Sequence, residues 1–176
     1  MKDRILLIGP QGSGKSTQAV FLSQHFGVPN ISTGDIFRKL SSEDSEPARK
    51  VKEILASGRL VDDETTAQIV KERLAEEDCQ NGFVIDGYPR SIRQIEIFDP
   101  GFNKVFYLAV PNEEVIRRLT KRGREDDTPE LIQTRLDLYN QQTQPLLDYY
   151  RKKQILVEID GTGDIQKVQD EIKKFI

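Results

Sequence analysis

The sequence has no tryptophan and only one cysteine, one histidine and one methionine in 176 residues. A single thiol, Cys79, excludes an internal disulfide and any metal site built from a cysteine cluster. A single imidazole, His25, likewise excludes a histidine-rich metal site. We therefore expect Cys79 to have no chemical role and His25 to lie exposed or half-buried on the first helix.

Long apolar runs and a strong net charge are also missing. No stretch approaches the roughly 20 apolar residues of a membrane-spanning helix, and no signal peptide is recognisable. The net charge of −3 provides no basic surface for nucleic acid. Hydrophobic residues make up 36% of the chain and charged residues 31%, as in a polar-surfaced enzyme. We expect a cytoplasmic protein that binds neither membranes nor nucleic acid.

The most informative motif that is present occupies residues 9–16, where G-P-Q-G-S-G-K-S matches the phosphate-binding pattern G-x-x-x-x-G-K-S/T. An apolar run at 4–8 predicts a buried strand before it, and residues 15–26 predict a helix after it. Glycines let the backbone wrap around a polyphosphate, and the helix N-terminus points N–H groups at the anion. Lys15 adds a positive charge near the β- and γ-phosphates. A glycine turn that binds nothing is the weaker reading in this strand–turn–helix context.

Strands and helices alternate along the chain, which is long enough for one domain with appendages. The predicted strands are 4–8, 29–31, 82–86, 104–110 and 154–159, and the predicted helices are 15–26, 64–77, 112–121, 129–152 and 165–175. This order predicts an α/β fold with a five-stranded parallel sheet and helices on both faces. Ligands then bind at the carboxyl ends of the strands.

Two segments interrupt the alternation. Residues 32–61 combine a helix start at Ser32-Thr33-Gly34-Asp35, a polar loop and a second amphipathic helix at 48–57, and they predict an inserted helical subdomain. Residues 122–127 form a short charged turn, which we interpret as a minimal lid. The core then consists of 1–31, 62–121 and 128–176, and we expect both appendages to move over the phosphate loop.

Phosphoryl transfer depends on positioning and positive charge, for which forked guanidinium groups are well suited. The candidates are Arg38, Arg90, Arg118, Arg122, Arg124 and Arg135. Each alone could be a solvated surface residue, but several fall at a strand end or in a predicted flap. Asp86 ends a predicted strand and could hold a magnesium ion with the Ser16 hydroxyl, or it could cap a turn.

Five motifs in order resemble the adenylate kinase family over residues 9–163. They are G-P-Q-G-S-G-K-S-T at 9–17, S-T-G-D at 32–35 with Arg38, G-R-L-V at 58–61, D-G-Y-P-R at 86–90 with Gln94, and R-G-R-E-D-D at 122–127 with Arg135. The resemblance implies a P-loop NTP-binding fold, with an NMP-binding insertion at 32–61 and a lid at 122–127.

The resemblance also implies roles for individual residues. ATP would be bound by Gly12, Ser13, Gly14, Lys15, Ser16, Thr17, Arg118, Arg122 and Gly163, with Arg118 stacked on the adenine. AMP would be bound by Thr33, Arg38, Arg59, Leu60, Val61, Gly87, Tyr88, Pro89, Arg90, Gln94, Arg124 and Arg135, with Gln94 reading the adenine edge. Catalysis would fall to Lys15, Arg90, Arg122, Arg124 and Arg135. A cis Tyr88-Pro89 bond is expected from the same resemblance.

The chain departs from the family pattern at four places. Ser16 stands where the family usually has glycine, Asp62 stands where Leu-Val-Pro-Asp has proline, and Gly163 replaces a frequent lysine. The lid is shorter than the family's short lids, and it cannot carry the zinc site of some long ones.

The resemblance implies an enzyme that converts ATP and AMP reversibly into two ADP with Mg²⁺, as a monomer. The attacking AMP phosphate oxygen is already ionised, so no general base is needed. One alternative is a UMP/CMP kinase, although Thr33 and Gln94 favour adenine because pyrimidine kinases usually have alanine and asparagine there. The other is a regulatory protein that binds adenine nucleotides without turnover, which only the short lid supports.

Overall fold

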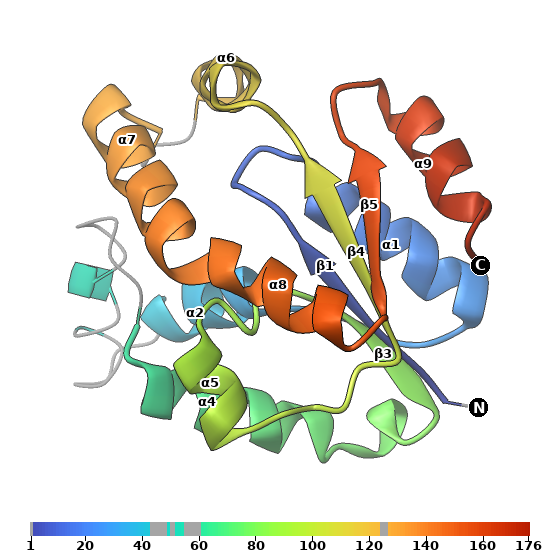
Figure 1. The fold of residues 1–176 in the computed structure, drawn as a ribbon. Coiled ribbons are helices and arrows are strands. Elements are labelled where there is room, and N and C mark those ends of the chain that lie inside the picture. The colour runs from blue at the N-terminus through green and yellow to red at the C-terminus, as the bar shows by residue number, and fades with distance from the viewer. Residues whose placement is uncertain (1, 43–48, 50–51, 55–60, 124–126) are drawn as a thin grey trace.

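The computed structural model describes residues 2–42, 49, 52–54, 61–123 and 127–176 (Figure 1). Within these residues all strands belong to one parallel sheet, in the order β2-β3-β1-β4-β5. The strands are β1 (Asp3–Ile8), β2 (Asn30–Ser32), β3 (Gly82–Asp86), β4 (Lys104–Ala109) and β5 (Leu156–Asp160). The predicted five-stranded parallel sheet is thus confirmed.

Helices cover both faces of the sheet, with α1 and α9 on one side and α4 and α8 on the other (Figure 1). The α-helices whose bounds lie within the described residues are α1 (Lys15–Phe26), α2 (Thr33–Ser41), α4 (Asp63–Leu74), α5 (Ile92–Ile97), α6 (Asn112–Arg122), α7 (Pro129–Leu138), α8 (Gln144–Lys152) and α9 (Ile165–Lys173). Among the described residues, no helix is long and apolar enough to cross a membrane.

The central strand β1 explains why both faces need helices. Ile5 and Leu7 pack into one hydrophobic cluster with α1 and α9, whereas Leu6 and Ile8 pack into the other with α4 and α8. Side chains alternate between faces along a strand, so a strand buried on both faces has a continuous apolar sequence. This is the pattern that residues 5–8 display.

One predicted helix, residues 129–152, is wrong as a single element. The structure divides it into α7, a π-helical turn (Tyr139–Thr143) and α8. Pro145 stands at the start of α8, where it has no N–H to donate and its ring would clash with the carbonyl four residues earlier in a continuous α-helix. The π turn, in which Gln144 N–H bonds to the Tyr139 carbonyl, takes up the extra residue there.

Other boundaries also differ from the predictions. Helix α4 ends at Leu74, so Cys79 lies in a separate 3₁₀ turn (Glu77–Cys79) and is buried. The short helix α5 was not predicted; it is capped by Ser91, whose hydroxyl accepts a hydrogen bond from the Gln94 N–H. His25 is exposed on α1, as expected.

The predicted helix start at residues 32–35 is confirmed. Ser32 caps α2 by accepting a hydrogen bond from the Asp35 N–H at 3.2 Å. Phe37 of α2 packs with Val61 in a small hydrophobic cluster separate from the sheet. Most of the predicted second helix, 48–57, lies outside the described residues.

Candidate functional site

The phosphate-binding loop connects β1 to α1. Gly14 caps α1 with φ 94°, and Gly12 has φ 78°, a left-handed conformation that favours glycine. A Cβ on Gly12 would also lie 3.1 Å from the Leu119 side chain of α6. Because Gly14 has no side chain to occupy the first N–H groups of α1, the helix terminus can bind an anion.

Lys15 begins α1 and folds back over this loop. Its Nζ donates to the Gly9 carbonyl at 2.7 Å and to the Pro10 carbonyl at 2.8 Å. Desolvation lowers the pKa of Lys15 to about 8, with Asp86 raising it and Arg90 and Arg122 lowering it further. Phosphate oxygens bound beside the loop would therefore stabilise the charged form of Lys15.

Ser16 and Asp86 meet across the central pair of strands. The parallel register places Asp86 of β3 beside Leu7 of β1, two residues before the loop starts. The Ser16 hydroxyl donates to Asp86 Oδ2 at 2.7 Å, and Asp86 is only 7% exposed. A hydroxyl and a carboxylate are hard oxygen donors beside a phosphate loop, so the two residues fit a magnesium ion that is bound mainly by nucleotide phosphates.

The predicted residues of both nucleotide sites converge on one cleft above the loop. Those that line it are Gly12, Gly14, Lys15, Ser16, Thr17, Arg38, Asp86, Gly87, Arg90, Arg118 and Arg122. Pro89 and Arg135 line an adjoining cavity that shares Lys15, Gly87 and Arg90 with the cleft. The arginines come from three helices and one loop, so the fold rather than local sequence brings them together.

Arg90 lies in the loop that follows β3, four residues after Asp86. Its Nε donates to the Gly87 carbonyl at 3.0 Å. Burial lowers its pKa, Asp86 raises it, and Arg135 and Arg38 lower it. Gly87 has φ 94°, and a Cβ there would collide with Thr33. The backbone after β3 thus helps to fix the orientation of the Arg90 side chain. The Tyr88-Pro89 bond is cis, which confirms that expectation.

Arg118 connects α6 to the loop after β5. Its Nε donates to Glu114 at 2.7 Å, and Nη2 donates to the Thr162 carbonyl at 3.1 Å. A further hollow is lined by Arg118, Gly163, Gly12, Ser13, Gly14 and Thr17. The structure therefore brings Gly163 and Arg118, both predicted for the ATP adenine, to the same side of the loop.

Arg122 and Arg135 face one carboxylate. Arg122 donates to both oxygens of Asp127, Nε at 2.8 Å and Nη2 at 2.6 Å, and Arg135 Nη1 lies 3.7 Å from Asp127 Oδ1. The Asp127 side chain is fully enclosed. An anionic group thus already lies between two guanidinium groups that were predicted to bind phosphate.

Four described residues of the predicted sites line neither the cleft, nor the adjoining cavity, nor the hollow beside Gly163. Thr33, Val61, Tyr88 and Gln94 are buried, and the Tyr88 hydroxyl donates to the carbonyls of Gln94 and Phe98 in the core. Because the Tyr88 side chain lies in the core, only its backbone could contact a ligand. Arg59, Leu60 and Arg124 lie outside the described residues.

Sequence reasoning missed other residues at the site. Gln18 lines the hollow beside Gly163, is 2% exposed, and donates from Nε2 to the Ile165 carbonyl at 3.2 Å. Asp127 holds the two arginines described above. A polar residue on the buried stripe of the first helix was a signal for Gln18, and an acidic run beside arginines was a signal for Asp127.

A strand–glycine loop–helix unit with a lysine, a Ser–Asp pair and converging arginines defines a P-loop nucleotide-binding protein. The comparisons narrow this class. The family model described as "Adenylate kinase" matches residues 7–155. The chain belongs to the adenylate kinase family, and hence to the nucleoside monophosphate kinases, which are phosphotransferases.

Three relatives illustrate the similarity; each is named adenylate kinase. The protein of Bifidobacterium longum (strain NCC 2705) is 42% identical over 180 residues, covering 96% of this chain and 97% of the relative. Those of Archaeoglobus fulgidus (38% over 210 residues) and Clostridium kluyveri (38% over 211 residues) each cover 98% of this chain and 97% of the relative. The two longer alignments contain gaps in this chain, because the chain has only 176 residues.

Proposed function

We propose that the protein transfers the γ-phosphoryl group of ATP to AMP, reversibly and with Mg²⁺, giving two ADP. The observation that carries the proposal is the single cleft lined by the phosphate loop, Lys15, Arg38, Arg90, Arg118 and Arg122. Such a concentration of cations matches the phosphate groups of two nucleotides placed end to end. An oxygen of the AMP phosphate would form a bond to the γ-phosphorus, while the bond from that phosphorus to the β-phosphate oxygen breaks.

In this proposal the two nucleotides bind to different sides of the cleft. ATP would lie on residues 12–17, with its adenine between Arg118 and Gly163 and its phosphates near Lys15 and Arg122. AMP would lie against α2 and the end of β3, with Arg38 and Arg90 on its phosphate. The nearby Arg135 would contact the transferred group, together with Arg124. Thr33, residues 59–61, 87–89 and Gln94 would complete the acceptor site.

The residues of the cleft would lower the barrier by alignment and charge neutralisation. Two phosphate groups that repel each other in water would be held by fixed cations, and an ionised phosphate oxygen needs no base. A bound Mg²⁺ would screen the phosphate charges. Ser16 and Asp86 would hold it, directly or through water. We further propose that the protein acts as a cytoplasmic monomer.

The test is ADP formation from ATP with AMP, UMP, CMP, GMP and dTMP as acceptors. Fast turnover with AMP alone supports the proposal. Preference for UMP or CMP would make the protein a pyrimidine kinase. Tight binding of a two-headed adenosine polyphosphate without turnover would make it a regulatory protein.

A Lys15→Met variant tests the mechanism in the same assay. We expect its turnover to fall on the order of 10²–10⁵-fold, because the lysine acts on charge that develops during transfer. Wild-type turnover in this variant would refute the assignment of Lys15.

A further inference from the structure

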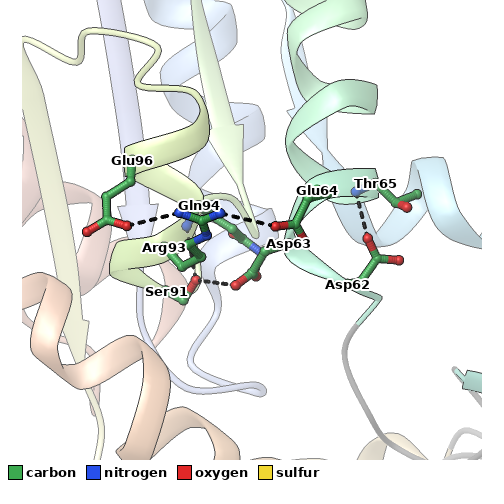
Figure 2. A network of polar contacts seen from close by, with 8 residues as sticks. All are labelled: Asp62, Asp63, Glu64, Thr65, Ser91, Arg93, Gln94 and Glu96. Atoms are coloured by element: carbon green, nitrogen blue, oxygen red, sulfur yellow. Dashed lines mark hydrogen bonds and ion pairs between the residues drawn. The ribbon is translucent and has the colours of Figure 1, made fainter.

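The N-terminus of α4 and the N-terminus of α5 are joined by a cluster of polar side chains (Figure 2). At its centre is Asp63, whose two oxygens have different partners. Oδ1 accepts from Gln94 Nε2 at 2.8 Å, and Oδ2 accepts from the Ser91 hydroxyl at 3.1 Å. Asp63 does not line the nucleotide-binding cleft, and Gln94, which is 1% exposed, does not line it either.

The Gln94 amide has only one possible orientation in this cluster. Its Oε1 accepts from the Arg90 backbone N–H at 2.7 Å, while its Nε2 donates to Asp63. A backbone N–H can only donate, and an ionised carboxylate can only accept. Turning the amide over would place two donors together at Arg90 and two acceptors together at Asp63. Gln94 is 1% exposed, so water cannot readily compensate for either mismatch.

A fixed amide discriminates between nucleobases. After its contacts with Asp63 and Arg90, the Gln94 side chain retains one N–H and one acceptor lone pair. A 6-aminopurine offers a donor at N6 beside ring acceptors, whereas a 6-oxopurine offers an acceptor at O6 beside a donor at N1. A freely rotating glutamine could match either pattern by turning over. A glutamine held in one orientation matches only one.

We propose that Asp63 is a positioning residue that holds the Gln94 amide in the orientation for a 6-aminopurine, and so sets the acceptor selectivity against 6-oxopurines. The inference rests on the proposed function, because Gln94 is taken there as the residue that reads the base of AMP. Asp63 acts through Gln94 and touches no substrate itself.

The chain offers a matched control in the same cluster. Glu64 is the next residue of α4, has the same charge, and also reaches α5, where its Oε1 lies 3.4 Å from Arg93 Nη2. Both side chains of that pair are mostly exposed, at 66% and 60%. Removing Glu64 therefore removes an acidic residue from the first turn of α4 and an ion pair with α5, but it changes no contact of the Gln94 amide.

The experiment compares kcat/KM for AMP and for inosine monophosphate in the wild type, Asp63→Ala, Asp63→Asn and Glu64→Ala. We expect Asp63→Ala to lower the ratio of the two values about tenfold, since one of the two contacts that fix the amide is lost. Asp63→Asn should restore most of the ratio, because its amide oxygen still accepts from Gln94. Glu64→Ala should keep the wild-type ratio, and KM for ATP should stay constant in all variants.

Asp63→Leu serves as the second variant if Asp63→Ala does not fold, because it keeps the branched shape of the side chain and removes the acceptor. A folded Asp63→Ala or Asp63→Leu protein with the wild-type ratio would overturn the inference alone, as would an equal loss in Glu64→Ala. A wild type that phosphorylates inosine monophosphate as well as AMP would overturn both this inference and the assignment of AMP as the specific acceptor.

Discussion

For individual residues of the site, the sequence motifs predicted roles but not contacts. The pattern around Lys15 predicted its role, but its contacts with the Gly9 and Pro10 carbonyls depend on the folded loop. Arg90 was predicted from its place after a strand, whereas its burial and its bond to Gly87 depend on packing. Gln94 could be assigned from the family motif, but nothing near it in sequence indicated Asp63, 31 residues away.

The lowered pKa of Lys15 gives a testable pH dependence. A lysine is charged below its pKa, so the free protein loses this charge as pH rises through about 8. We expect kcat/KM for ATP to fall above that pH. At saturating ATP the fall should move to higher pH, because bound phosphates stabilise the ammonium. Initial rates from pH 7 to 10 measure both profiles, and a kcat/KM independent of pH over this range would contradict the prediction.

A conservative change at Arg90 should be costly. Arg90→Lys keeps the positive charge but loses the fork that lets a guanidinium bind Gly87 and phosphate together. We expect kcat/KM for AMP to fall on the order of 10²–10³-fold. Arg93→Lys, at the exposed neighbour on α5, should leave kcat/KM within about twofold. Steady-state kinetics decide, and equal effects of the two changes would argue against a phosphate contact for Arg90.

At the scale of elements, helix starts were more predictable than helix ends and breaks. Ser32 was recognised as a start because a short hydroxyl side chain can bond the N–H three residues on. Helix α5 has the same type of cap at Ser91, but its six residues are too few to show a periodic pattern. The break at Pro145 was missed because the apolar spacing continues on both sides of it.

The cap of α9 provides a prediction on stability. Asp164 accepts from the Lys167 N–H at 2.8 Å, so Asp164→Ala should lower the free energy of unfolding by about 1 kcal/mol. Asp170→Ala, which removes an exposed ion pair with Lys173 from the same helix, should change it by less than about 0.5 kcal/mol. Urea unfolding of the three proteins gives the values. Equal losses would mean that charge, and not capping, stabilises α9.

At the scale of the whole molecule, the order of the sheet creates the site. Because β1 lies between β3 and β4, the loop after β1 and the residues after β3 leave the sheet side by side. Helices α2 and α6 then place Arg38 and Arg118 at the same cleft. The domain boundaries predicted at 32–61 and 122–127 remain predictions.

Nucleotide binding should bring these appendages together. Spin labels at Lys39→Cys on α2 and at Lys121→Cys, the residue of α6 directly before the second appendage, should approach each other when a two-headed adenosine polyphosphate binds, because α2 and the end of α6 line the same cleft. Labels at Gln24→Cys and Lys167→Cys, on α1 and α9 of the core, should keep their distance. Pulsed electron paramagnetic resonance measures both pairs. An unchanged distance between α2 and α6 would contradict the proposed closure.

The sequence by itself determined the strands, most helices, the phosphate loop and the set of candidate arginines. These features depend on side chains within a few positions of one another, through alternation, helical spacing and caps. Only the tertiary structure decided that Ser16 meets Asp86, that Arg122 and Arg135 share Asp127, and that Asp63 orients Gln94. The first and the last of these contacts join residues 70 and 31 positions apart, so they follow from strand order and packing, which no local pattern encodes. The contacts of Asp127 join near neighbours, but they depend on how α6 and α7 pack.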